Sequence, residues 1–379
     1  MAKVNTLLVI GNGFDLAHGM KTSYRDILNA IMSDMAVGNQ NIDFTSEEEF
    51  KAYAHKFDVN MINKVFKAYN NQWQKNHSGK YEAYKVMQLN GDLVNSYQYA
   101  RSYLIKYGNW WFQYFMSVLT NRDRRMGEGW VDFEAEIHHV VANIENILLN
   151  KTYDDDLAVV FGGYATDLIA MREQLIPELK SDLNILNVII EFYLNQEEVH
   201  GEEKKIKLID SIENVRAILS YNYTHTYQNV YDESFKNIYY LHGEVKEHNL
   251  VLGTDETLSN DLKNTLLECA DFKKIYQLVY YRLGNRYKHI FSMPGCGGAE
   301  WNAVIYGHSL TAADSYSLGW LFKKSNNDLF AGRIKHITIY YYNEKAYNEQ
   351  LANLFQIIGQ ERVLEYISDG DIEFEKIPH

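Results

Sequence analysis

The hydrophobic pattern of the chain predicts two different kinds of structure. A continuous β-favouring run, Asn5 to Ile10, stops abruptly at Gly11, which indicates a strand buried on both faces of a parallel sheet. A helix is predicted to follow over about residues 22–35. Between about residues 45 and 200 strand-like runs are absent, and apolar residues recur at helical spacing instead. This central block is therefore expected to be all helical.

Four helices are predicted in the central block. They cover about residues 92–119, 131–149, 155–176 and 181–196. The first of them is rich in aromatic side chains near its end. Such stripes usually form core, although a homo-oligomer interface would show the same pattern. The aromatic residues in question are Trp110, Trp111, Phe112 and Phe115.

Strand-like runs return after residue 205. We predict strands at Val215–Leu219, Ile238–Leu241, Leu250–Leu252, Trp301–Tyr306 and Ile337–Tyr342. Helices are expected between and after them at 271–283, 315–323 and 345–358. Alternating strands and helices indicate an α/β fold with a Rossmann-like, mostly parallel sheet. The predicted organisation is one α/β domain, residues 1–44 and 205–379, with a large all-helical insertion at 45–204.

Charge and composition narrow the classes of partner. The 379 residues contain 37 Lys and Arg against 50 Asp and Glu, a formal charge of −13, so neither nucleic acid nor an anionic membrane surface is an expected partner. No apolar stretch approaches the length of a membrane span, and the N-terminal apolar run is too short for a secretory signal. With only two cysteines as well, we expect a cytoplasmic protein.

Polar residues and glycines follow four of the predicted strands at the point where each strand ends. They lie in the segments 11–15, 220–225, 242–244 and 307–309, the last with Asp314 just beyond it. Ligands of open parallel sheets bind outside the carboxyl ends of the strands. We therefore expect these segments to converge on one crevice.

The glycines after the first strand suit a close approach of the backbone to a ligand. Without a Cβ, Gly11 and Gly13 allow a tight turn and let N–H groups reach a diphosphate. The next glycine is Gly19, so the spacing is neither G-x-G-x-x-G nor a Walker loop. A purely structural bend is the alternative.

Each candidate side chain also has a structural interpretation. Asn222 is compatible with an Asx cap at a strand end, and His242 with a satisfied core histidine. Asp15 fits either a helix cap or a contact with a ribose hydroxyl. Asp314 precedes a predicted helix and favours an N-cap, and Ser309 fits a turn.

No metal site is expected. Glu134 and His138 lie four residues apart on one helix, but no second histidine has metal-ligand spacing. Glu134 is better interpreted as a polar contact that faces the crevice. His225 and His308 flank the crevice as ligand contacts or as solvent-facing loop residues.

Several motifs together resemble a known family. The string LLVIGNGFDLAHGMKTSYRDIL at 7–28 looks like the opening motif of AbiH-like proteins, a group named for bacteriophage abortive infection. WVDFE, SYNYTHTY, YLHGE, IYGHSL and ITIYYYNE resemble the same family in order. The resemblance implies a role in phage defence, with an unknown phage-derived trigger as a partner.

More distantly, the order of motifs is similar to that of sirtuin-like domains, which consume NAD. Gly11-Asn12-Gly13 with Gly19 stands where those domains have a diphosphate loop and a second glycine. Asn222 matches their water-positioning asparagine, and His242 matches the histidine that acts as their general base. Gly307-His308-Ser309 matches their nucleotide-holding Gly-x-Ser.

Two positions depart from the sirtuin-like pattern. Asp15 replaces the usual serine of the first loop, and Thr224 stands where aspartate is normal. The metal-binding cysteines of protein deacetylases are absent, so deacylation is not expected. The resemblance implies catalytic roles for Asn222 and His242. The residues implied to contact the nucleotide are Gly11, Asn12, Gly13, Phe14, Asp15, Gly19, Thr224, Gly307, Ser309 and Asp314.

Three functions are compatible with this sequence. The leading hypothesis is a defence protein that binds NAD or a related nucleotide and hydrolyses its nicotinamide–ribose bond, with His242 as base and Asn222 orienting water. The first alternative, favoured by Thr224, is a nucleotide-binding sensor that signals through the helical insertion without chemistry. The second is a structural partner protein in which the glycine turn is only a bend.

Overall fold

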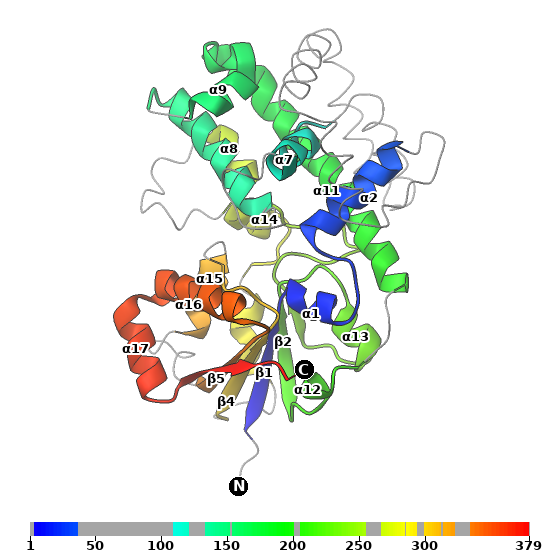
Figure 1. Cartoon of the computed structure of the whole chain (residues 1–379), viewed down its shortest axis with the longest axis vertical. Coiled ribbons are helices and arrows are strands. Elements are labelled where there is room, and N and C mark those ends of the chain that lie inside the picture. Colours follow the sequence, from blue (N-terminus) through cyan, green and yellow to red (C-terminus); the bar gives the residue numbers. More distant parts are fainter. Residues whose placement is uncertain are drawn as a thin grey trace.

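The computed structural model describes ten segments of the chain. They are residues 4–36, 109–120, 133–151, 154–200, 205–254, 267–284, 286–293, 299–311, 314–322 and 334–378. Within these segments the protein has two layers, a parallel sheet with flanking helices and a helical layer beyond the carboxyl ends of the strands (Figure 1). Much of the predicted helix 92–119 lies outside the described residues.

The sheet has six strands and confirms the predicted Rossmann-like α/β fold. Its order is β3-β2-β1-β4-β5-β6, with every neighbouring pair parallel. This is the strand order of dinucleotide-binding folds, in which the crevice opens between the two central strands at the topological switch point. The strands are β1 (Asn5–Ile10), β2 (Val215–Ser220), β3 (Ile238–Tyr240), β4 (Trp301–Tyr306), β5 (Ile334–Tyr341) and β6 (Ile372–Lys376).

Alternate side chains of the central strands fill cores on opposite faces of the sheet. Leu7 and Val9 of β1 pack on one face, which the helices α15 (Ser315–Leu321), α16 (Glu344–Ile358) and α17 (Gln360–Ser368) cover. Leu8 and Ile10 pack on the other face, beside α12 (Lys207–Asp210) and α13 (Thr226–Val230). Because both faces are covered, β1 is apolar at successive positions instead of alternating.

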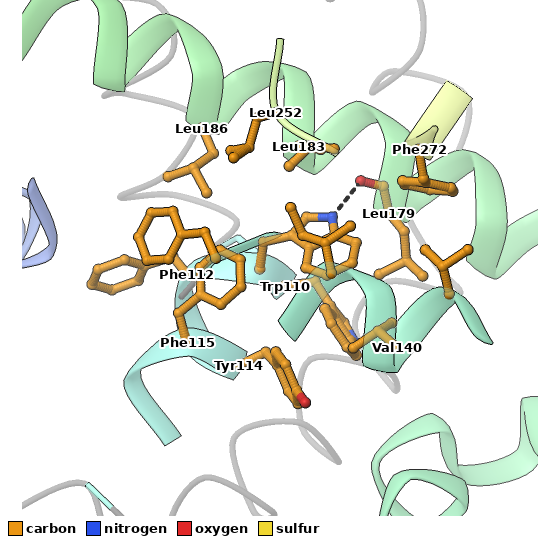
Figure 2. Packing of buried hydrophobic residues seen from close by; sticks show 14 of the residues in the cluster. Trp110, Phe112, Tyr114, Phe115, Val140, Leu179, Leu183, Leu186, Leu252 and Phe272 are labelled. Atoms are coloured by element: carbon orange, nitrogen blue, oxygen red, sulfur yellow. Dashed lines mark hydrogen bonds between the residues drawn. The ribbon is translucent and has the colours of Figure 1, made fainter. Parts of the chain in front are cut away.

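The helical layer has its own core, which Figure 2 shows from close by. Trp110, Phe112, Tyr114 and Phe115 pack among leucines and Phe272, and the indole N–H of Trp111 donates to the carbonyl of Leu179 at 2.7 Å. The predicted aromatic stripe is therefore core. The helices of this layer are α2 (Tyr24–Ala36), α7 (Trp110–Thr120), α8 (Phe133–Leu148), α9 (Asp155–Phe161), α10 (Leu168–Ala170), α11 (Ile176–His200) and α14 (Lys274–Tyr280).

Three predicted elements differ from the structure. The run Leu250–Leu252 is not a strand, because its backbone bonds elsewhere: Val251 N–H donates to the carbonyl of His242, and Leu252 N–H to the side chain of Gln277. The predicted helix 155–176 breaks after α9 into a 3₁₀ turn at Gly162–Ala165, and a new helix begins at Leu168 with Asp167 as its N-cap. The helix predicted over 181–196 extends further in both directions, as α11.

Pro177 lies near the start of α11, and the backbone before it adapts to it. The preceding residues, Met171–Leu175, form a π-helical turn. Proline has no N–H to donate, and its ring crowds the carbonyl four residues earlier, so a wider turn accommodates it. Among the described residues, no helix has the length and apolar character needed to cross a membrane.

Candidate functional site

A cavity of about 770 Å³ opens at the carboxyl ends of the central strands. Residues at the carboxyl ends of β1 to β5 line it, together with Tyr24, Ile27, Glu134 and Leu194 from the helical layer. The structure therefore brings most predicted site residues together. Those lining the cavity are Gly11, Asn12, Gly13, Asp15, Asn222, Thr224, His242, Gly307, Ser309 and Asp314.

Two of the predicted contacts are not part of the cavity lining. Phe14 is fully buried and packs edge-on against Tyr306 within the core. Gly19 lies in the turn after helix α1 (Asn12–Ala17), where its φ of +80° explains the glycine.

The glycines after β1 and β4 let two loops approach backbone to backbone. Gly13 N–H donates to the carbonyl of Gly307 at 2.8 Å, and a Cβ on Gly13 would lie 2.7 Å from Gly307 Cα. A Cβ on Gly11 would likewise lie 2.8 Å from the backbone of His308. The contact between loops therefore accounts for both glycines, and their contact with a diphosphate stays a prediction.

Asp15 is a buried carboxylate and does not cap a helix. Gly11 holds the N-cap position of α1, whereas Asp15 lies inside the helix and accepts a hydrogen bond from the Thr224 hydroxyl at 2.5 Å. Its other oxygen, Oδ1, has no hydrogen-bond partner among the described residues. Burial raises the pKa of Asp15 to about 6, although Thr224, Thr226 and Asn222 act in the opposite direction.

Asn222 is a buried amide that the surrounding protein does not satisfy. Asn222 is 4% exposed, and neither atom of its side-chain amide makes a hydrogen bond in the described part of the chain, although the amide lies near enough to Asp15 to help keep that carboxyl ionised. The turn at this strand end is fixed by Ser220, whose hydroxyl bonds to the Asn222 backbone. The side chain is therefore not an Asx cap. An unsatisfied buried amide is costly, so its place in the cavity lining favours a ligand contact.

A buried charge network surrounds His242. Its Nε2 lies 2.8 Å from Asp314 Oδ1, and Nζ of Lys274 lies 3.0 Å from the same oxygen. Lys274 also contacts Glu134 Oε2 at 2.7 Å. On the other side, His308 Nε2 lies 3.3 Å from Asp314 Oδ2. Asp314 occupies the predicted N-cap position of α15, but its side chain makes no cap hydrogen bond and is used here instead.

The protonation states in this network follow from its geometry. Burial alone would raise the pKa of Asp314, but Lys274 and His242 hold it well below its usual range. An ionised carboxylate can only accept a hydrogen bond, so the hydrogen on the His242 ring is on Nε2 and Nδ1 is a proton acceptor. Burial, followed by the charge of Lys274, lowers the pKa of His242. His242 is thus a neutral base near neutral pH.

The flanking histidines do not face solvent as simple loop residues. His308 is buried and its Nδ1 accepts from the Leu310 N–H. His225 Nδ1 and Nε2 lie 3.0 and 3.1 Å from carboxylate oxygens of Glu198 and Glu244. The pairing of His225 with Glu198 has no signal in the sequence, because Glu198 belongs to the predicted helical block and lies 27 residues away.

Lys274 belongs to this charge network and was not predicted from the sequence. It is the first residue of α14, inside the predicted helix 271–283, where a lysine carries no motif. Glu134, in the first turn of α8, does face the cavity as expected, and it pairs with Lys274. In the described ranges, no group of three or more side chains suited to a metal is found.

Comparison with known proteins agrees with the motifs. The model of the family described as "Bacteriophage abortive infection AbiH" matches residues 7–330. Neither the curated proteins nor the solved structures contain a match. Because the family match covers most of the 379 residues, the chain belongs to the AbiH family of bacteriophage abortive infection proteins.

Proposed function

We propose that this protein binds NAD or a related nucleotide in the cavity and hydrolyses its nicotinamide–ribose bond during abortive infection. One observation carries the proposal: a neutral histidine, an unsatisfied buried amide and a buried carboxylate line a cavity at the switch point of a sheet with dinucleotide-binding strand order. The volume of about 770 Å³ lies within the range of small-molecule sites.

The residues suit the chemistry of this cleavage. The nicotinamide leaves with the electron pair of its bond to ribose, which creates an oxocarbenium-like transition state. Water then forms the new bond to the ribose carbon, and Nδ1 of His242 takes its proton. Asn222 orients that water, and the carboxylate of Asp15 binds a ribose hydroxyl or stabilises the developing positive charge.

The two departures from the sirtuin-like pattern are in contact with each other. Asp15 and Thr224 share the 2.5 Å hydrogen bond described above. A carboxylate and a hydroxyl have exchanged places between the two loops, so both groups remain at the cavity. This supports a retained ribose-binding function for the pair.

The test is nicotinamide release from NAD by the purified full chain, with Asn222→Ala and His242→Ala as variants. Matched controls are Asn143→Ala and His248→Ala. The Asn143 amide is buried but satisfied by His139 and Asp154, and His248 is bound to Glu191 on α11. We expect release by the wild type and both controls, and none by either site variant. Retained release in Asn222→Ala or His242→Ala would remove that residue from the mechanism.

A sensor without chemistry is the second candidate function. It is favoured by the cavity lining, because Tyr24, Ile27 and Leu194 would transmit ligand binding directly to the helical layer. It predicts no nicotinamide release, but stabilisation of the wild type by NAD, about 4 kcal/mol at 1,000 times Kd. That stabilisation should weaken in Asn222→Ala. Absence of both release and stabilisation would refute both functions. The phage-derived trigger and the homo-oligomer stay predictions.

A further inference from the structure

Lys274 contacts His242, the proposed base, but does not line the cavity. Its side chain is 6% exposed, and its Nζ contacts Glu134, Asp314 and His242, the last at 3.4 Å from Nε2. The backbone at Lys274 is fixed as well, since its N–H donates to the carbonyl of Thr254 at 2.8 Å. The cation is therefore held in one place by groups from several elements.

The groups in this network come from separate parts of the fold. Glu134 belongs to α8 of the helical layer, Lys274 to α14, and Asp314 precedes α15, whereas His242 follows β3. The other titratable groups facing His242 are His308 after β4 and Tyr221 and Tyr223 after β2. The network thus joins the helical layer to the ends of the strands.

We propose that Lys274 is a positioning residue for His242, and that Glu134 anchors it to helix α8. The cation keeps Asp314 ionised, so that Asp314 accepts the hydrogen on Nε2 of His242 and leaves Nδ1 as the proton acceptor. The inference rests on the proposed function only in making His242 the base. The charge arrangement itself is a property of the protein with or without NAD.

The charge balance shows why a lysine is needed at this place. Without Lys274, the buried carboxylate of Asp314 would keep only His242, at 2.8 Å, and His308, at 3.3 Å, as described neighbours able to become cations. Buried charges are paired, so the nearest group able to become a cation would take that role. That group is His242, and a protonated imidazole has no lone pair with which to accept a proton from water.

The test follows the titration of His242 in the full chain by NMR, with histidine labelled at the ring carbon Cε1. His242→Gln identifies the resonance. In Lys274→Met we expect the titration midpoint of His242 to rise by about one pH unit or more, the usual effect of losing a charge within 4–6 Å. Glu134→Gln removes the opposite charge and keeps the cation, so its midpoint should not rise. A general loosening of the fold would not separate the two variants in this way.

Lys273→Met is the matched control. Lys273 is the adjacent lysine, is similarly buried, and pairs with Glu145 of the same helix α8 at 3.2 Å, but it does not contact His242. Its substitution should leave the His242 midpoint unchanged. If Lys274→Met does not fold, the double variant Glu134→Gln/Lys274→Met removes both charges of the pair and should still raise the midpoint.

A second readout ties the residue to the reaction. If NAD is cleaved, the pH below which the rate falls should be higher in Lys274→Met than in the wild type. This shift should match the rise of the NMR midpoint of His242. An unchanged midpoint in Lys274→Met, or in the double variant, would overturn the positioning role whatever the activity. Absence of NAD cleavage together with a raised midpoint would instead refute the proposed function and leave Lys274 supported.

Discussion

Replacing Gly307 by alanine should destabilise the protein by closing the space between the loops after β1 and β4. Gly307 has a φ of +68°, in the left-handed region that favours glycine. A Cβ at this position would lie 2.2 Å from the Phe14 nitrogen and 2.5 Å from the carbonyl carbon of Gly13. Both atoms belong to backbone that is hydrogen-bonded in place, so neither can move without breaking the loop contact.

Two contributions add up at Gly307. A left-handed conformation costs a residue with a Cβ roughly 1–2 kcal/mol. Forcing an extra methyl group into packed surroundings typically costs about 1–3 kcal/mol more. We therefore expect Gly307→Ala to lower the free energy of unfolding by about 2–5 kcal/mol.

Gly370→Ala separates the two contributions. Gly370 has a similar φ of +73°, but a Cβ there would meet nothing within 4 Å. Its substitution should therefore show the conformational term alone, about 1–2 kcal/mol. The measurement is urea denaturation of wild type and both variants at one temperature. Equal losses in the two variants would refute the steric reasoning and the close loop contact on which it depends.

Three further predictions concern buried groups. Because burial raises the pKa of Asp15 from 3.8 to about 6, the contribution of Asp15 to the free energy of unfolding should fall by about 3 kcal/mol as the pH rises across that interval. Asp15→Asn should therefore be more stable relative to wild type at pH 7.5 than at pH 4.5 in urea denaturation, and an equal difference at the two pH values would contradict this. Burial would lower the pKa of His225, but Glu198 and Glu244 raise it to about 9, so its stabilising charge is present below about pH 6.5 and lost as the pH rises through 9. His225→Gln should therefore reduce stability by up to about 3 kcal/mol at pH 6 and by less at pH 9.5; a pH-independent loss would argue against the ion pairs. Phe115→Ala should lower the free energy of unfolding by about 3–5 kcal/mol, because Phe115 is fully buried and stacks on Phe133. Tyr342→Ala is the control: Tyr342 is 66% exposed, so its substitution should change the free energy of unfolding little.

The central strands could be predicted because they are buried on both faces. β1, β2 and β4 each contain three or four successive apolar residues, LLVI, AIL and AVIY, and their predicted ends agree with the structure to within a residue. β6 was missed because it lies at the edge of the sheet and alternates as IEFEK. β6 pairs with one strand only and has a charged face. Its residue pattern therefore resembles that of an exposed turn or a helix end.

Short apolar runs carry too little information to fix a strand. Leu250–Leu252 is as apolar as β3, and each of its residues is buried. Its buried polar groups are satisfied by a loop carbonyl and by Gln277 instead of a strand ladder. The apolar run at 250–252 therefore reflects burial and does not require a strand. In contrast, the break after α9 had a local signal, since Gly162-Gly163 and the capping residue Asp167 both precede the new helix.

The candidate site was predictable where it depends on topology and unpredictable where it depends on packing between layers. The ends of parallel strands share one edge of the sheet, so the sequence alone places Asp15, Asn222 and His242 close together. Lys274 is 40 residues from Asp314 and on a different element from Glu134. Only the packing of α8 and α14 over the strand ends brings these charges together.

The same packing joins the helical layer to the network around His242. The core of the helical layer includes Ile27 from α2 and Leu252, Cys269 and Phe272 from the chain after β3, as well as residues of the predicted insertion 45–204. The division of the chain at residues 45 and 205 remains a prediction, but the layer packs as one unit with segments that reach the cavity. A partner that shifts α8 would move Glu134, and through Lys274 it would change the charge around His242. The helical layer thus supplies part of the charged environment of His242.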